Sequence, residues 1–162
     1  MSEEMKNNSQ SDSNNDIMLK EIDLIQSCIN RMAQNSFALK GWTLTLNGII
    51  MGLFADKGEP IITQVICIVS LICFWGLDAF FLRTEKLYRW KYDWVISERL
   101  KTKENAYDLN PYNEKMWLKK ENGEKRKQPS VMQIMCSKTL WPMYTVILLI
   151  NIAFLVYHWC SC

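Results

Sequence analysis

The chain has 162 residues and a formal net charge of +2, and 49% of its residues are apolar. Its mean hydropathy is near neutral, but the apolar residues concentrate in 41–55, 60–82 and 139–160, while 1–16 and 97–128 are strongly polar. The average therefore hides a membrane portion and a water-exposed portion. The spacing of the six cysteines fits neither a disulfide framework nor a zinc site, which excludes those two classes of small domain.

The N-terminal residues predict two different structures in succession. Residues 1–16 are rich in Ser and Asn, with no apolar stretch behind a basic start, so we expect a disordered tail and no secretory signal. Residues 17–40 predict a cytoplasmic amphipathic helix with Asp16 as its N-cap. Its apolar seam is spaced alternately by four and three residues, and it packs either on the same subunit or between subunits. The seam residues are Met18, Ile22, Ile25, Ile29 and Met32.

We expect this helix to continue without a breaker into the first membrane span, 41–55. About fifteen residues is short of the ~20 that cross a bilayer. Small residues at spacings of four, three and four share one face of the helix and permit close helix packing. A three-helix protein has little interior of its own, so we favour oligomerisation over packing within one subunit. The small residues are Gly41, Thr45, Gly48 and Gly52.

The remaining elements follow a turn at 56–60. The strongest span is 60–82, and its helix should project from the membrane to about Lys103. Residues 105–128 predict an irregular segment with one helical turn near 116–119. A short apolar stretch then precedes the third span, 139–160.

The distribution of Lys and Arg sets the orientation. The 83–138 segment holds fourteen Lys/Arg against eight Asp/Glu, while residues 1–40 hold four against six. The 56–60 turn has one Lys and the C-terminal tail has no Lys or Arg. By the positive-inside rule, the N-terminus and the 83–138 segment are cytoplasmic, and the C-terminus lies outside.

Three polar residues within the predicted spans are candidates for a pore or gate, since polar groups at such depth face protein or a water-filled path. They are Asn47, Asp78 and Asn151. Asp78 has a simpler role as the partner of Lys40 or Arg31 in an ion pair, and a charged ring at a pore mouth needs a symmetric oligomer. Because no chain of intramembrane carboxylates is present, a proton-coupled transporter is poorly supported.

The 83–138 segment interleaves cations with aromatic rings. Such a surface suits a nucleotide or single-stranded nucleic acid, because rings stack on bases and cations neutralise phosphates. The same composition below a membrane also serves packing or attraction to anionic lipid, which the residues alone favour. The phosphate candidates are Arg83, Arg89, Lys91, Arg99 and Lys119, and the stacking candidates are Trp90, Trp94 and Tyr112.

No constellation of residues predicts catalysis. The chain has one His, no Gly-rich phosphate loop and no nucleophile elbow, so we expect a protein that is not an enzyme and needs no cofactor. The terminal run His158-Trp-Cys160-Ser-Cys162 lacks a fourth ligand, and we expect no metal site there.

Two longer motifs flank the first two spans. They are Arg31-Met-Ala-Gln-Asn-Ser-Phe-Ala-Leu-Lys-Gly-Trp42 and Phe74-Trp-Gly-Leu-Asp-Ala-Phe-Phe-Leu-Arg-Thr-Glu85. From about residue 22 to its end, the chain resembles a family of small bacterial multi-pass membrane effectors of anti-phage defence, and is similar to the channel-forming effectors of Hailong defence. The matching motif positions include Asn35, Gly41, Asp78, Arg83 and Glu85. Packing explains these positions equally well, and no ligand residue is carried over.

This resemblance implies an all-α membrane protein with three transmembrane helices and cytoplasmic helical extensions, assembled as a homo-oligomer with four subunits by analogy. It implies an inner-membrane ion channel, gated by a nucleotide or single-stranded DNA oligomer, that arrests growth when open and has a nucleotidyltransferase as its functional partner. The alternative is a membrane-anchored scaffold whose basic segment docks a protein partner or anionic lipid.

Overall fold

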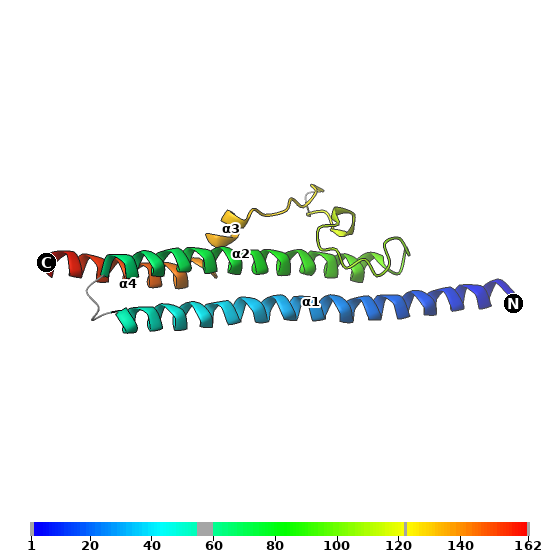
Figure 1. Cartoon of the computed structure of the whole chain (residues 1–162). Coiled ribbons are helices and arrows are strands. Elements are labelled where there is room, and N and C mark those ends of the chain that lie inside the picture. The colour runs from blue at the N-terminus through cyan, green and yellow to red at the C-terminus, as the bar shows by residue number, and fades with distance from the viewer. Residues whose placement is uncertain (1, 55–59, 122, 162) are drawn as a thin grey trace. The chain divides into compact units, whose positions relative to one another are not determined.

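The computed structural model describes residues 2–54, 60–121 and 123–161, and that part of the chain contains helices and no strands. The all-α prediction is therefore confirmed (Figure 1). Most of the predicted 56–60 turn, and Cys162, lie outside the described residues. The elements are α1 (Ser2–Phe54), α2 (Pro60–Glu98), the short 3-10 helix η1 (Glu114–Met116), α3 (Val131–Met135) and α4 (Trp141–Ser161).

The ends of the two long helices differ from the sequence-based expectations. The N-terminal tail that we expected to be disordered is helical from Ser2, and Asp16 lies inside α1 rather than capping it. Two polar side chains of this region are bonded: Asn14 donates to the Leu100 carbonyl at 3.2 Å, and Ser13 accepts from Lys103 Nζ at 3.3 Å. Composition alone does not reveal such partners, and this explains why the tail was predicted to be disordered.

The chain divides into two compact units, to each of which α1 and α2 contribute. The first comprises the residues up to Met32 together with 84–128. The predicted seam of α1 packs in its core, which settles the open alternative in favour of packing within the chain. The core consists of Ile25, Cys28, Tyr88, Val95 and Met116, with Met18, Ile22, Ile29 and Met32 packed against it.

The first unit is organised around a buried ion pair between Glu21 and Arg99, whose side chains are 2% and 0% exposed. Arg99 donates from Nε and Nη2 to the two carboxylate oxygens at 2.5 and 3.0 Å. Its remaining donors reach three loop carbonyls, those of Thr102, Glu104 and Asn105, at 3.1, 2.7 and 3.3 Å. These five bonds match the five N–H groups of a guanidinium, so the buried charge is fully satisfied.

The same pair explains why α2 ends at Glu98, before the predicted Lys103. The carbonyls bound by Arg99 belong to the turn that follows, so the chain folds back around the guanidinium. Tyr107 has a φ of 60°, a region that side chains rarely adopt. Its N–H donates to Glu21 Oε1 at 2.5 Å, which helps to hold this conformation.

The second unit comprises 33–83 and the residues from Pro129 onward. Trp75 stacks on Tyr144 with 5.5 Å between ring centroids and donates to the Met135 carbonyl at 3.1 Å. Ser130 and Gln133 form a capping box that starts α3 directly after Pro129. The core of this unit consists of Leu71, Ala79, Ile134, Leu140, Tyr144 and Ile147.

The surface of the second unit is apolar. Within the described residues, a single helix, Ile61–Glu98, is long and apolar enough to cross a bilayer, and Trp141–Tyr157 is apolar but shorter. By this measure one of the three predicted spans is supported, and the other two stay predictions. Large apolar side chains more than half exposed include Ile61, Ile62, Val65, Val69, Ile72, Val146, Leu149 and Ile150.

The buried ion pair gives a first prediction. Glu21→Ala leaves Arg99 buried without its carboxylate, which typically costs about 3–5 kcal/mol of folding free energy. We expect a large loss of stability in chemical unfolding, and faster amide hydrogen exchange in 99–107. Glu98→Ala is the matched control, because Glu98 forms a surface pair with Lys101 at 3.0 Å. The Glu98→Ala variant should lose less than about 1 kcal/mol of folding free energy. Equal losses in the two variants would contradict the organising role of the buried pair.

Candidate functional site

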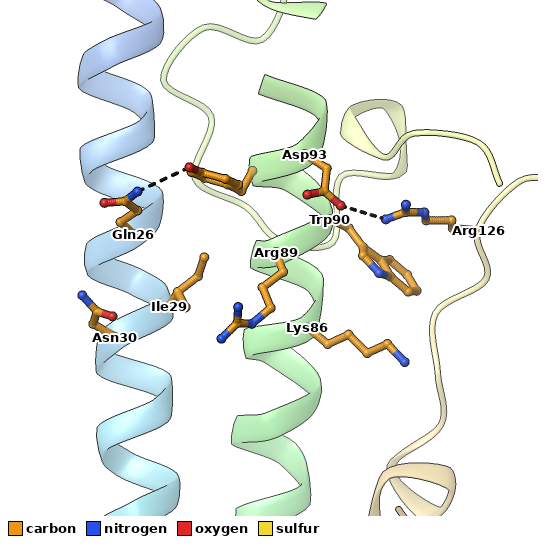
Figure 2. A pocket seen from close by; sticks show the side chains of 9 residues that line it. Gln26, Ile29, Asn30, Lys86, Arg89, Trp90, Asp93 and Arg126 are labelled. Atoms are coloured by element: carbon orange, nitrogen blue, oxygen red, sulfur yellow. Dashed lines mark hydrogen bonds and ion pairs between the residues drawn. The ribbon is translucent and has the colours of Figure 1, made fainter. Parts of the chain in front are cut away.

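The first unit contains a half-open hollow of about 730 Å³ between α1 and the end of α2 (Figure 2). Three cationic side chains and one carboxylate line it, so its electrostatic character is basic. Figure 2 shows Arg89 directed toward α1, and Lys86 and Trp90 directed toward the segment that carries Arg126. The lining residues are Gln26, Ile29, Asn30, Lys86, Arg89, Trp90, Tyr92, Asp93 and Arg126.

The aromatic element of this hollow is Trp90, and two cations lie over its ring. Lys86 Nζ is 5.7 Å from the ring centroid, and the Arg126 guanidinium carbon is 5.3 Å from it. Such cation–π contacts keep a flexible cation near the ring. The indole also meets Trp117 edge to face, with 5.3 Å between centroids and 74° between planes.

The ion pairs at the rim leave positive charge available. Arg89 donates to Glu85 at 2.7 and 2.9 Å, but its side chain is 62% exposed. Arg126 reaches Asp93 at 3.4 Å, a long contact between partly exposed groups (Figure 2). Exposed pairs of this kind contribute about 0–1 kcal/mol, so an anionic ligand can displace them at little cost.

A second, smaller hollow of about 330 Å³ lies beside the first, and the two share Arg126. The contacting rings of Trp90 and Trp117 belong to the first and second hollow respectively. The result is a continuous basic surface on which Trp90 is the open ring, while Trp117 is buried beneath it at 8% exposure and donates its N–H to the Pro111 carbonyl at 3.1 Å. The second hollow is lined by Glu114, Lys115, Trp117, Lys119, Lys125 and Arg126.

Three of the predicted ligand residues are placed on this surface. Arg89 and Trp90 line the first hollow, and Lys119 lines the second. Arg83 belongs to the other unit, and neither hollow is lined by Tyr112, although that ring is 40% exposed.

The other three predicted ligand residues require correction. Lys91 and Arg99 are 1% and 0% exposed, so they offer no surface to a phosphate. Lys91 Nζ donates to the Asn110 carbonyl at 3.0 Å and lies 3.6 Å from Asp108, while Arg99 is bound to Glu21. Trp94 lies under the Arg99 guanidinium, 5.1 Å from its central carbon, and therefore supports the buried pair.

Sequence reasoning missed Lys86, Arg126 and Trp117. A helical signal for Lys86 was present, because residues 86, 89, 90 and 93 fall on one face of a helix at spacings of three and four. Arg126 and Trp117 are in a segment without regular periodicity, where spacing carries no information about neighbours.

In the second unit, the ion pair predicted for Asp78 is confirmed, with Lys40 as the partner at 2.7 Å. The carboxylate also accepts hydrogen bonds from Ser36 and, at 3.0 Å, from the Tyr144 hydroxyl. Asp78 is fully buried in one chain, so a charged ring formed by exposed Asp78 carboxylates does not fit this structure. Asn47 and Asn151 are also buried, 4% and 1% exposed.

The small-residue face of α1 remains open. A side-chain carbon added at Gly41, Gly48 or Gly52 would meet nothing within 4 Å, and Thr45 is exposed. The face is therefore not used for packing among the described residues of this chain.

The chain matches no protein-family model, no curated protein and no solved structure. Among the described residues, no three His, Cys, Asp or Glu side chains gather as a metal site would require.

Asp108 gives a second prediction. Burial raises its pKa, but hydrogen bonds from Asn113 and the Asn110 N–H, together with the charge of Lys91, outweigh that effect and hold the pKa below its ordinary value of 3.8. A carboxylate with a lowered folded-state pKa stabilises the fold above the unfolded value, and this contribution is lost as the pH falls through the folded-state pKa. Chemical unfolding below pH 3.8 should therefore show a steeper loss of stability for the native chain than for Asp108→Asn. Parallel pH profiles would show that the carboxylate has no such role.

Proposed function

We propose that this chain is an oligomeric ion-channel effector of bacterial anti-phage defence in the inner membrane. A nucleotide or single-stranded DNA oligomer, bound to the first unit, sets its gate, and the open channel arrests growth. The observation that carries the proposal is the Trp90 ring with cations at 5.7 and 5.3 Å, in contact with the basic surface around Trp117.

The chemistry of that surface favours a nucleotide over a simple anion. Base stacking on an aromatic ring contributes about 1–3 kcal/mol per base, and neighbouring cations neutralise the phosphates. The two hollows share Arg126 and both are lined by cations, so a ligand with more than one phosphate can use both. Trp90 is the ring available for stacking a base, because Trp117 is 8% exposed. Gln26 and Asn30 add amide groups that can hydrogen-bond to a base edge.

Three features support placement in a membrane as an oligomer. The second unit has an apolar exterior, one of its helices is long and apolar enough to span a bilayer, and the glycine face of α1 is open. We propose three spans, at 41–55, 60–82 and 139–160, with the N-terminus in the cytoplasm and the C-terminus outside. The open glycine face is then available for contact between subunits, four of them by analogy with the family that the motifs resemble.

Gating requires the ligand to bind the open and closed states unequally. The helices that line the first hollow, α1 and α2, are the ones that continue in sequence into the proposed spans. A ligand that changes the packing of these helices in the first unit therefore acts on the elements that enter the membrane. A nucleotidyltransferase is the proposed source of such a ligand.

The test is to reconstitute the purified protein in planar bilayers and add single-stranded DNA oligomers at the cytoplasmic side. We expect an ion current that the oligomer changes. If the oligomer closes the channel, overexpression of the protein alone should arrest growth. If the oligomer opens it, growth arrest should require the oligomer as well. Bilayers that stay silent under every oligomer, together with a stable co-purifying protein, would favour the membrane-anchored scaffold instead.

The ligand surface gives a third prediction. Trp90→Ala should weaken oligonucleotide binding by about 1–3 kcal/mol through loss of stacking. Arg126→Ala should weaken it and reduce the slope of log affinity against log salt by about 0.7, the value for one phosphate contact to a single strand. Both effects are measured by fluorescence anisotropy across a salt series.

Lys101→Ala is the matched control, because Lys101 is a cation of the same unit that lines neither hollow. We expect Lys101→Ala to leave both the affinity for the oligonucleotide and the salt dependence of that affinity unchanged. If Lys101→Ala and Arg126→Ala had equal effects, binding would depend on net charge and not on this surface.

A further inference from the structure

The interior of the second unit contains amide side chains from three helices. Asn47 of α1, Gln64 of α2 and Asn151 of α4 are 4%, 1% and 1% exposed. The side-chain oxygens of all three, and the nitrogen of Gln64, have no hydrogen-bond partner in the part of the chain that the structure describes. A buried polar group without a partner costs about 1–3 kcal/mol, so three of them in one small unit require a reason.

The orientation of the two asparagines is fixed by their own helices. Asn47 Nδ2 donates to the Thr43 carbonyl at 3.0 Å, and Asn151 Nδ2 donates to the Ile147 carbonyl at 2.8 Å. Each nitrogen is therefore used along the helix, and each oxygen is left as an acceptor facing away from those bonds. Among the described residues, the three side-chain oxygens and the Gln64 nitrogen have no partner, while each asparagine nitrogen donates one of its two N–H groups.

These groups lie at successive levels along the unit. Tyr144 bonds to Asp78 and also interacts with the side chain of Thr43, so all three helices meet near that level. Asn47 is four residues beyond Thr43 and Asn151 seven beyond Tyr144, which at 1.5 Å per residue gives about 6 and 10 Å.

On α2, which runs opposite to α4 (Figure 1), Gln64 is fourteen residues from Asp78, or about 21 Å. From Asn47 to Gln64 the amides therefore cover about 15 Å, or roughly half of a ~30 Å hydrocarbon core.

We propose that these amides line a hydrated site for monovalent cations in the interior of each subunit. The effect of this site on conduction rests on the proposed channel function. If that function holds, ions pass through the interior of each subunit and not along an axis between subunits. Neutral carbonyl oxygens are ligands for hard cations such as Na⁺ and K⁺, and water bridges the longer gaps.

The charge of the site selects the class of ion. The oxygens of all three amides are without a partner, whereas both asparagine nitrogens already donate, so the unpartnered atoms carry mainly partial negative charge and disfavour an anion. Asp78, the buried carboxylate among the described residues of this unit, is already neutralised by Lys40 and bonded to Ser36 and Tyr144, so it is not a free anionic ligand for a divalent cation. A monovalent cation with part of its hydration shell fits what remains.

A test that needs no current is thermal unfolding of the detergent-purified protein in chlorides of Na⁺, K⁺ or N-methylglucamine at equal ionic strength. The native chain should unfold about 2–4 °C higher in one of the small cations, the shift that ligand binding to the folded state produces in a protein of this size. Asn151→Leu, which keeps the branching and the number of side-chain heavy atoms, should lose this dependence while remaining folded. Equal cation dependence in both proteins, or none in the native chain, would overturn the site.

The conduction consequence is tested in bilayers. Asn47→Leu and Asn151→Leu should each lower unitary current about tenfold, equivalent to about 1.4 kcal/mol on the barrier. Leu149→Val, on the exposed apolar surface of α4, is the control and should leave the current unchanged. Thr45→Val changes the face proposed to lie between subunits, and it should not lower the unitary current of the assembled channel. The reverse result, with current sensitive to Thr45→Val alone, would place the path between subunits. A native protein without current contradicts the proposed function, and the unfolding experiment still decides the cation site.

Discussion

The ion pair of Glu21 and Arg99 is the constraint on which the first unit depends. Both groups are removed from water, and an unpaired charge there would cost several kcal/mol. The five N–H donors of Arg99 offset that cost by bonding to five acceptors, three of which are carbonyls of the following turn. Because those carbonyls must face the guanidinium, the path of the chain after α2 is set by one side chain. The irregular segment that carries Trp117 and Arg126 begins from that fixed turn.

This arrangement explains which parts of the ligand surface could be predicted. Helix periodicity identified the apolar seam of α1 but left its partner open, and the interleaving of cations with aromatic rings identified the region of Arg89 and Trp90. It could not tell a structural cation from a free one, since Lys91 and Arg99 occur in the same basic, aromatic pattern as Lys86 and Arg89. What separates them is burial and partners from 99–110, and those contacts depend on the tertiary path of a segment without periodicity.

The buried polar side chains of the second unit include a carboxylate and several amides. Asp78 was predictable as an ion-pair partner because a lone carboxylate in an apolar helix needs a cation, and of the two candidates, Lys40 and Arg31, the structure pairs it with Lys40. Asn47 and Asn151 were predictable as buried polar groups, but their role depends on whether they face a neighbouring subunit or their own. The structure places both in the interior of one chain, and the open face is the one with the glycines.

The contrast between the units is informative about function. In the first unit the two fully buried cations are matched with carboxylates and carbonyls, as stability demands. In the second, Asp78 is satisfied, yet the amide oxygens beyond it are not. Leucine has the same branching as asparagine without its polar atoms and would remove that cost, so packing alone does not account for these amides. Polar groups that lower stability are expected where they interact with something other than the fold itself. In a unit with an apolar exterior, a small cation and its water are the partners that match unpaired carbonyl oxygens.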